Sequence, residues 1–238
     1  MKIELAGISK VYGRKRALDQ IRLEVPAGRI VAVVGLNGAG KSTLLHCLAG
    51  LLSLSEGTIF YDDEAFTRER VDLRMRFGFL PDFPVFFNHM MPLQHIGMAL
   101  RLYEKDGPSA EDRVLELLRG FDLMPVAGTP MVALSRGQIY KVALTALIAA
   151  NPELWLLDEP MASGMDALGL REFRERARTA AEAGATVIYT TQILAVAEQF
   201  SDEVIVLHHG RLHAHGPVAS LHADGELESV LAGLRETA

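Results

Sequence analysis

One stretch near the start of this chain, residues 35–43, limits what the chain can fold into more than any other feature. Its glycines, lysine and serine follow the spacing G-x-x-x-x-G-K-S of a phosphate-binding loop. The apolar run Ile30–Val34 before it predicts a buried strand, and residues 43–49 after it have the apolar spacing of a helix. The stretch consists of Gly35, Leu36, Asn37, Gly38, Ala39, Gly40, Lys41, Ser42 and Thr43.

The chemistry of these residues suits the phosphate chain of a nucleotide. Gly38 and Gly40 lack a Cβ atom, so the backbone can curl and aim several N–H groups at one point. The helix that follows adds its positive N-terminal end. Lys41 can reach the β- and γ-phosphates, and the hydroxyl of Ser42 can ligate Mg²⁺. An ordinary glycine-rich turn is the alternative, but the flanking strand and helix favour nucleotide binding.

A second polar site follows the buried strand predicted for Leu154–Leu157. Asp158 and Glu159 stand side by side there, and adjacent carboxylates at a strand end are costly unless they act on a cation or a proton. In a protein with a phosphate-binding loop, the first carboxylate is expected to coordinate Mg²⁺. The second points the other way and can polarise a water molecule. A surface loop after a strand is the alternative for this pair.

The remaining pattern predicts an α/β protein with an inserted helical lobe. Helices dominate residues 83–151, one of them behind a capping box at 109–112 and another opened by residues 134–138, where a serine and a glycine can form a second anion-binding helix end. The aromatic and methionine residues of 83–91 serve either the core of this lobe or a docking surface for a partner helix. Strands are expected at residues 2–5, 18–25, 58–61, 76–80, 186–191, 204–207 and 211–215.

Composition narrows the classes of function. The net charge of -6 argues against a large nucleic-acid surface, and the single cysteine, Cys47, fits a reducing compartment. No apolar run is long enough to cross a bilayer and the N-terminus does not resemble a signal peptide, so we expect a soluble protein. Four histidines within residues 208–215 leave metal binding open beside the commoner case of exposed histidines, with His213 and His215 expected on one strand face. The tail after Gly216 is predicted to end in a short amphipathic helix.

Taken in order, these motifs resemble those of the ATP-binding cassette (ABC) ATPases of membrane transporters, along nearly the whole chain. Residues 35–42 match the Walker A loop, and 154–158 match Walker B with Glu159 at the position of the catalytic glutamate. Residues 134–138 look like the LSGGQ signature, with Arg136 in place of the first glycine, and 163–166 are similar to the D-loop. Compact length and an acidic residue at position 82 lean towards a bacterial export-type system.

The resemblance implies a P-loop NTPase (RecA-like) core with an antiparallel β subdomain and an inserted helical subdomain. Residues 1–82 would hold the β subdomain and Walker A, 83–150 the helical subdomain with the signature, and 151–238 the rest of the core. The implied cofactors are ATP and Mg²⁺. The metal would be held by Ser42, Asp158 and Asp82, and hydrolysis would use Glu159, Lys41 and Gln192. Outside Walker A, the residues expected to contact ATP are Tyr12 (stacked on adenine), Asp82, Ser135, Gly137 and Gln138.

The resemblance also implies two protein partners and no nucleic acid. One is a second cassette, identical or different, because ATP would lie between Walker A of one subunit and the signature of the other. The other is an integral membrane permease, a separate chain whose cytoplasmic helix would dock near residues 82–91. The protein would then be cytoplasmic and peripheral on the inner face of the cell membrane. A cassette of DNA repair or translation is a third possibility, which the net charge disfavours.

Two residues depart from the family pattern. Asp82 stands where glutamine is usual, and Gln192 stands where a histidine usually contacts the γ-phosphate. Glutamine can donate a hydrogen bond but cannot become cationic. We therefore expect ATP binding with slow hydrolysis. The alternative is a weakly catalytic, nucleotide-gated dimerisation subunit that depends on a competent partner cassette. Cargo and transport direction are not encoded in any recognisable motif.

Overall fold

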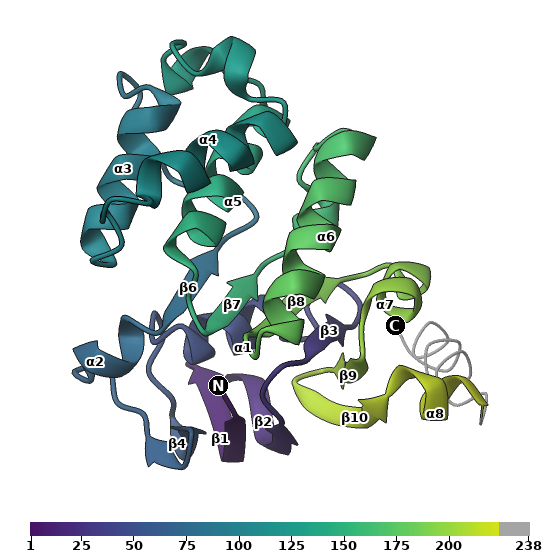
Figure 1. The fold of residues 1–238 in the computed structure, drawn as a ribbon. Helices are drawn as coiled ribbons and strands as arrows, with labels where there is room; N and C mark the ends of the chain where they lie inside the picture. The colour runs from purple at the N-terminus through teal and green to yellow at the C-terminus, as the bar shows by residue number, and fades with distance from the viewer. Residues whose placement is uncertain (224–238) are drawn as a thin grey trace.

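The computed structural model describes residues 1–223, and its centre is a six-stranded sheet (Figure 1). The strand order is β10-β9-β3-β8-β7-β6. Five of these strands are parallel, and β10 pairs antiparallel with β9 at one edge. Because the parallel strands share a direction, their carboxyl ends meet at one edge of the sheet. The strands are β3 (Ile30–Val34), β6 (Phe77–Leu80), β7 (Leu154–Leu157), β8 (Thr186–Thr191), β9 (Glu203–His208) and β10 (Arg211–Pro217).

A smaller antiparallel sheet of order β2-β1-β4-β5 lies on one face of the large sheet. It consists of β1 (Ile3–Tyr12), β2 (Lys15–Val25), β4 (Glu56–Tyr61) and β5 (Glu64–Ala65). Two of these strands start or end well outside the predicted ranges, since β1 runs to Tyr12 and β2 begins at Lys15. The hairpin turn between them is therefore only two residues long, Gly13 and Arg14.

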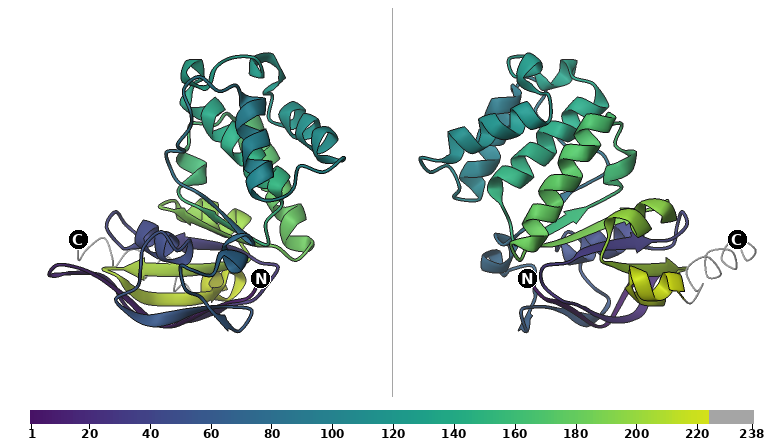
Figure 2. Two further views of the ribbon diagram at one scale, coloured as in Figure 1. Left: turned by 90° about the vertical axis from the view of Figure 1, so that its left-hand side faces the viewer. Right: turned by 45° about the vertical axis from the view of Figure 1, so that its right-hand side comes forward.

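The helices form most of the opposite layer (Figure 2). The predicted helical lobe contains α3 and α4 together with α5, which packs against both. Ser109 stands at the N-cap of α4, but its side chain makes no capping hydrogen bond, so the predicted capping box is wrong. The α-helices are α1 (Lys41–Leu48), α2 (Val71–Arg74), α3 (Pro92–Leu102), α4 (Ala110–Gly120), α5 (Arg136–Ala150), α6 (Ala167–Glu182), α7 (Leu194–Phe200) and α8 (Val218–Ala223), and the 3-10 helices are Met124–Val126, Met131–Ala133 and Pro160–Ala162.

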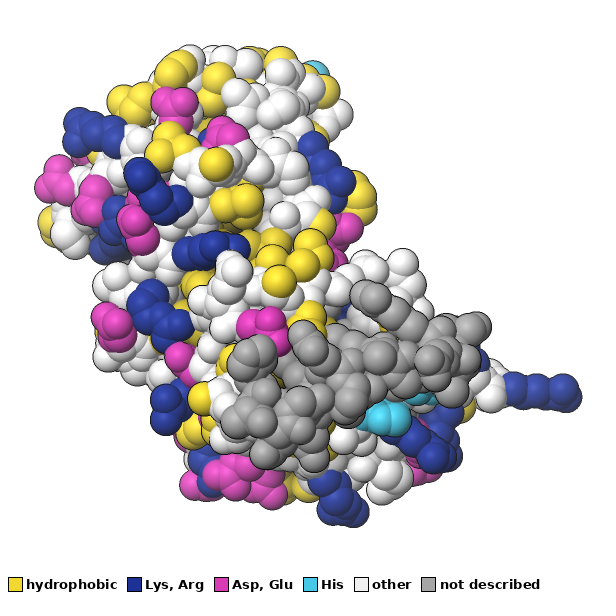
Figure 3. All heavy atoms as spheres, turned by 90° about the vertical axis from the view of Figure 1, so that its right-hand side faces the viewer, with side chains coloured by type: hydrophobic (Ala, Val, Ile, Leu, Met, Phe, Trp, Pro, Cys, Tyr) yellow, Lys and Arg dark blue, Asp and Glu magenta, His cyan; other side chains and the backbone are white. Residues whose placement is uncertain are grey.

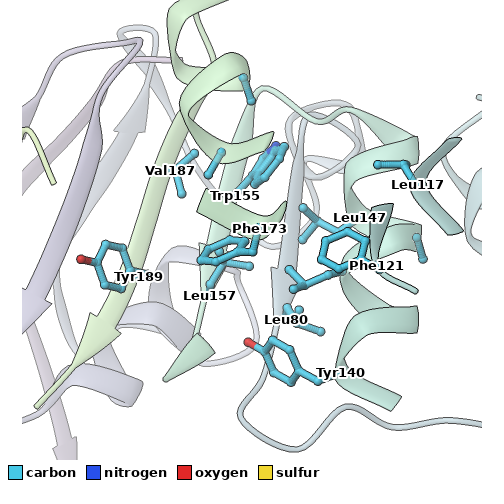
Figure 4. Close-up of a cluster of buried hydrophobic side chains, with 14 of the residues drawn as sticks. Leu80, Leu117, Phe121, Tyr140, Leu147, Trp155, Leu157, Phe173, Val187 and Tyr189 are labelled. Atoms are coloured by element: carbon cyan, nitrogen blue, oxygen red, sulfur yellow. The ribbon is translucent and has the colours of Figure 1, made fainter. Parts of the chain in front are cut away.

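Both faces of the large sheet are covered, which explains its uninterrupted apolar strands. Side chains alternate along β3: Ile30 and Ala32 enter one core, and Val31 and Val33 enter the other. The first core lies beneath the helices α3–α7 and contains Trp155, as Figure 4 shows. The second core lies between the two sheets around α1. The phosphate-binding loop is thus held between two packed layers.

The described residues leave part of the sequence-based expectations untested. No helix among residues 1–223 is both long and apolar enough to span a bilayer. The tail after Gly216 begins with α8 (Val218–Ala223), and the amphipathic helix predicted at its end lies outside the described residues. The division of the chain at residues 82 and 150 stays a prediction.

Candidate functional site: a nucleotide pocket at the carboxyl edge of the sheet

The phosphate-binding loop joins β3 to α1 in a conformation that requires glycine. Gly40 is the N-cap of α1 and has a φ of 108°. A Cβ atom at this position would also lie 2.7 Å from the carbonyl oxygen of Ala17. A residue with a side chain is therefore both strained and crowded here. The loop delivers the first N–H groups of α1, which carry the positive end of the helix dipole, to the edge of the sheet.

Lys41 is the first residue of α1, and its side chain is buried beneath the loop. Its Nζ donates a hydrogen bond to the carbonyl oxygen of Gly35 at 2.8 Å and lies 3.6 Å from Oε1 of Glu159. Burial lowers the pKa of Lys41, and the nearby Glu159 and Asp158 act in the opposite direction. A phosphate group would supply the negative charge that keeps this ammonium protonated.

Asp158, directly after β7, is the centre of a network of oxygen atoms. Its Oδ1 accepts hydrogen bonds from the hydroxyls of Thr190 at 2.6 Å and Ser42 at 3.2 Å. A hydroxyl and a carboxylate this close are hard oxygen ligands of the kind Mg²⁺ prefers. In the described part of the chain, no group of three or more His, Cys, Asp or Glu side chains could hold a metal alone. The pair therefore fits an ion that takes its remaining ligands from phosphate and water.

Glu159 is held beside this network by an unusual backbone. Its φ is 48°, in the left-handed region, and its N–H donates to Oγ1 of Thr190 at 2.8 Å. Burial raises the pKa of the Glu159 carboxyl, while Lys41 and the amide of Gln192 act against that rise. Strain of this kind persists when the surroundings fix the residue, and it is frequent at active sites. The carboxylate therefore lines the pocket within ion-pairing distance of Lys41.

A mostly polar pocket of about 390 Å³ joins these groups. It brings together the ends of β1, β3, β6, β7 and β8, although Asp82, Glu159 and Gln192 are far apart in the sequence. Predicted site residues that line it are Tyr12, Asn37, Gly38, Ala39, Gly40, Lys41, Ser42, Thr43, Asp82, Asp158, Glu159 and Gln192. Gly35 and Leu36 lie just beneath, where their carbonyl groups contact Lys41. The pocket has the position, at the carboxyl ends of parallel strands, that ligands occupy in α/β sheets.

Tyr12 reaches the pocket from the end of β1. Its ring is 45% exposed, and Nζ of Lys10 lies 5.2 Å from the ring centroid. An exposed aromatic face at the rim can accept a flat heterocycle by stacking. The stacking role assigned to Tyr12 remains a prediction, for which this exposure leaves the room.

The residues of the signature-like stretch do not line this pocket. Ser135 caps α5: its hydroxyl accepts from the N–H of Gln138, and the Gln138 side chain accepts from the N–H of Ser135. Gly137 packs against the D-loop, where a Cβ atom would lie 2.3 Å from the carbonyl oxygen of Gly164. The predicted helix opening is confirmed, and its residues do not line the pocket around the phosphate-binding loop of the same chain.

Asp82 reaches the pocket, but its carboxylate has a protein partner. Its Oδ1 accepts a hydrogen bond from Nη2 of Arg136 at 2.7 Å. The expectation that Asp82 ligates Mg²⁺ stays a prediction, and this ion pair competes with it.

Sequence reasoning missed Ala17, which lines the pocket, and two residues with polar side chains. Thr190, in β8, bridges Asp158 and Glu159, and Lys15, at the start of β2, lines the pocket. The signal for Thr190 was its place next to the end of a predicted buried strand. That signal becomes specific only once β8 is known to pair with β7. Nothing in the local sequence distinguishes Lys15 from the other basic residues of its turn.

The histidines near the C-terminal hairpin form a separate surface cluster. The rings of His208 and His213 are 5.3 Å apart, whereas Nε2 of His215 lies 3.1 Å from Glu203. A register shift between Leu212 and Ala214 places a bulge at His213, so the expected alternation that would give His213 and His215 one face is broken. On the face shown in Figure 3, histidine side chains lie among both basic and acidic ones.

Comparisons with known proteins agree with this geometry. The family model for ABC transporters matches residues 18–162. EcsA, an ABC-type transporter ATP-binding protein of Bacillus subtilis, is 30% identical over 88% of this chain and 85% of its own length. DrrA, the daunorubicin/doxorubicin resistance ATP-binding protein of Streptomyces peucetius, is 34% identical over 96% of this chain and 67% of its own length. CysA, a sulfate/thiosulfate import ATP-binding protein of Bacillus cereus, is 34% identical over 91% of this chain and 61% of its own length.

Two solved structures extend the likeness to the whole fold. An ATP-binding subunit of an ABC transporter has a TM-score of 0.91 at 28% identity, covering 99% of this chain and 100% of that one. A dimeric ATP-binding cassette with ADP and phosphate bound has a TM-score of 0.80 at 25% identity. The match covers 91% of this chain and 98% of that one. The chain therefore belongs to the ABC transporter family: it is an ATP-binding cassette with the P-loop NTPase fold, an ATPase of membrane transport.

Proposed function

We propose that this chain binds MgATP at the pocket between Lys41, Asp158 and Glu159 and hydrolyses it to energise a separate integral membrane permease. The observation that carries the proposal is the set of side chains at the neighbouring carboxyl ends of β3, β8 and β7. A buried lysine, a serine–aspartate oxygen pair and a strained glutamate lie within hydrogen-bonding or ion-pairing distance of one another there. Ser42 and Asp158 would hold Mg²⁺, which would supply positive charge to offset that of the phosphate groups.

Each residue of the chain then has one task. Lys41 exchanges its contacts with Gly35 and Glu159 for phosphate oxygens, because a phosphate is a stronger partner than a carbonyl group. Ser42 and Asp158 hold the metal, and Thr190 fixes the orientation of Asp158. Glu159 accepts a proton from the attacking water, and Gln192 holds that water by hydrogen bonding. Water activation of this kind contributes typically about 10²–10⁴-fold in rate.

The second half of the ATP site is proposed to come from another cassette. Ser135, Gly137 and Gln138 do not line the pocket of their own chain, and the positive end of the α5 helix dipole at Gly137 could serve the nucleotide of a facing subunit once the capping bonds of Ser135 and Gln138 are accounted for. The dimeric relative with ADP and phosphate bound supports this arrangement. The facing subunit is a second copy of this chain or a sibling cassette, and the γ-phosphate favours the closed pair because both faces contact it.

The permease is proposed to dock on an apolar groove beside the helical lobe. The groove has a volume of about 350 Å³ and includes Phe79, Pro84, Val85 and Ala146. Next to it, Phe83 is 66% exposed and Val85 is 89% exposed. Exposed aromatic and aliphatic side chains at a groove mark an interaction surface. Docking there would hold the protein on the inner face of the cell membrane. Among the relatives, DrrA is named for drug resistance and CysA for sulfate/thiosulfate import. Drug resistance and the acidic Asp82 favour export in this proposal.

Changing Val85 to aspartate is expected to release the protein from membranes without affecting ATP binding. A charge placed in an apolar contact must be desolvated, which lowers affinity by about tenfold or more. The measurement is the fraction of the protein that sediments with membranes when the permease is co-expressed. Leu51→Asp is the matched control, since Leu51 is 53% exposed and lies beyond α1. Equal sedimentation of all three proteins would contradict this docking site.

Changing Gln192 to histidine is expected to accelerate steady-state hydrolysis by the purified chain. Histidine adds a group that can become cationic beside the γ-phosphate, and one such transition-state contact is typically worth about 10²–10³ in rate. The measurement is phosphate release at saturating MgATP, with Glu159→Gln in each background as the inactive control. If the rate does not rise, the glutamine is not what limits hydrolysis.

The same assay separates the main proposal from its alternative. A nucleotide-gated dimerisation subunit would bind ATP and form dimers but show no turnover above the Glu159→Gln control. The observation that favours this second possibility is Gln192, which lies beside Glu159 in place of the usual histidine.

A further inference from the structure

Two of the positions at which this chain departs from the family pattern, 82 and 136, are in direct contact. Arg136 replaces a glycine of the signature, and Asp82 replaces a glutamine. Nη2 of Arg136 donates to Oδ1 of Asp82 at 2.7 Å, although 54 residues separate them. The Arg136 guanidinium also lies 4.3 Å from the ring centroid of Phe83, the next residue along the chain. A bonded and stacked guanidinium has little freedom, so the contact holds this segment against the start of α5.

Asp82 lies where its charge affects nucleotide binding. It lines the same pocket as Asp158 and Glu159, so that pocket contains three carboxylates. Lys41 and Lys15 are the two lysines among its lining residues. Asp158 has a proposed use in metal binding and Glu159 in proton transfer. Where Asp82 does not itself ligate Mg²⁺, its carboxylate repels the triphosphate unless a cation offsets it. Without Arg136, the wall of the pocket would carry an uncompensated negative charge.

The pKa of one buried hydroxyl responds to the charges of Asp82, Asp158, Glu159 and Arg136. The side chain of Tyr140, in α5, is fully buried in the core that Figure 4 shows. Burial raises its pKa well above the usual value of 10.0. The charges of Asp82, Asp158 and Glu159 raise it further, whereas Arg136 lowers it. The arginine therefore opposes the field of the three carboxylates within the protein.

We propose that Arg136 is a positioning residue for the ATP site of its own subunit, which it serves by neutralising and holding Asp82. The inference rests on the proposed function and adds a second task to the signature stretch. That stretch is expected to face the nucleotide of the other subunit. Through Arg136 it also sets the charge of the pocket in its own subunit. The negative charge that Asp82 introduces in place of glutamine is then offset by the positive charge that Arg136 introduces in place of glycine. Each substitution depends on the other.

The test is the affinity of the full-length chain for ATP in the wild type and three variants: Arg136→Gly, Asp82→Asn and the two changes together. We expect Arg136→Gly to weaken ATP binding by about fivefold, the effect of roughly one uncompensated charge in a partly exposed pocket. In the Asp82→Asn background, the same Arg136→Gly change is expected to alter affinity by less than about twofold. Affinity is measured by calorimetric titration of ATP into monomeric protein at fixed Mg²⁺, so that no second subunit takes part.

Two further variants distinguish this role from a merely structural one. Arg136→Lys keeps the charge and is expected to bind ATP like the wild type, whereas Arg136→Gln keeps the length and is expected to behave like Arg136→Gly. The loss should shrink as the salt concentration rises, because the Asp82 carboxylate becomes screened. A misfolded signature loop would instead weaken binding whatever residue stands at position 82, and it would lower the melting temperature.

The possible outcomes separate the inference from the function on which it rests. If wild-type protein does not bind ATP, the proposed function is wrong. If it binds ATP and Arg136→Gly has the same effect with either residue at position 82, the inference is overturned and the proposed function stands. The absence of any effect in either background overturns it as well. An interaction of about threefold or more between the two substitutions supports it.

Discussion

Replacing Glu159 with glutamine is expected to reduce ATP hydrolysis by about 10²–10⁴-fold while leaving ATP affinity within about twofold. The amide has nearly the same shape as the carboxylate but cannot accept a proton from water. Lys41, Ser42 and Asp158, which would hold the phosphates and the metal, remain in place. The measurement is the rate of phosphate release at saturating MgATP, compared with the dissociation constant for ATP.

The matched control for this change is Glu175→Gln, an exposed glutamate on α6 that forms an ion pair with Arg171 on the same helix. It should retain the wild-type rate, since surface ion pairs contribute little. A Glu159→Gln protein that keeps more than about a tenth of the rate would remove Glu159 from its role as the base.

The pH dependence of hydrolysis is a second test of Glu159 as the general base. Burial raises the pKa of Glu159 above its ordinary 4.5, and a base must be ionised to act. The rate should therefore fall as pH decreases through this raised pKa, at a pH above 4.5. An acid limb centred at or below the ordinary value would show that a different group limits the reaction.

The parts of the site that sequence predicted best are those built from neighbouring residues. The phosphate-binding loop works through consecutive residues and is bounded by a strand and a helix. Its spacing therefore carries almost all of its geometry. The same holds for Asp158 and Glu159, whose position at the end of a buried apolar strand fixes their placement at the edge of a parallel sheet.

Features that depend on distant contacts could not be predicted. The strand β1 continues through irregular pairing, with register shifts near Gly7 and Ser9 that break the alternation on which strand prediction relies. The bridge from Thr190 to Asp158 exists because β8 pairs with β7, which no local pattern specifies. The ion pair between Asp82 and Arg136 likewise arises only when the helical lobe packs onto the sheet.

Short elements escaped for a different reason. The helix α7 has only seven residues, too few for a 3.6-residue period to be recognised. Ser109 shows the converse case, in which a matching pattern does not produce the predicted interaction. Its ψ is 1° rather than extended, so its side chain does not reach the N–H groups of α4.

Replacing Lys41 with alanine is expected to weaken ATP binding by about 10²-fold or more. The Lys41 ammonium is already buried under the loop, where it contacts Gly35 and Glu159. It would form charge-assisted hydrogen bonds with the phosphates, each worth about 1.5–3 kcal/mol. The change also leaves Glu159 without its cation, which adds repulsion of the phosphates.

The most direct test of the whole account is therefore a calorimetric titration of MgATP into the wild-type chain and into Lys41→Ala. Lys105→Ala serves as a matched control, because Lys105 is an exposed lysine outside the pocket. The account predicts saturable binding by the wild type and the control, and loss of about two orders of magnitude in affinity for Lys41→Ala. No binding by the wild type, or unchanged binding by Lys41→Ala, would contradict it.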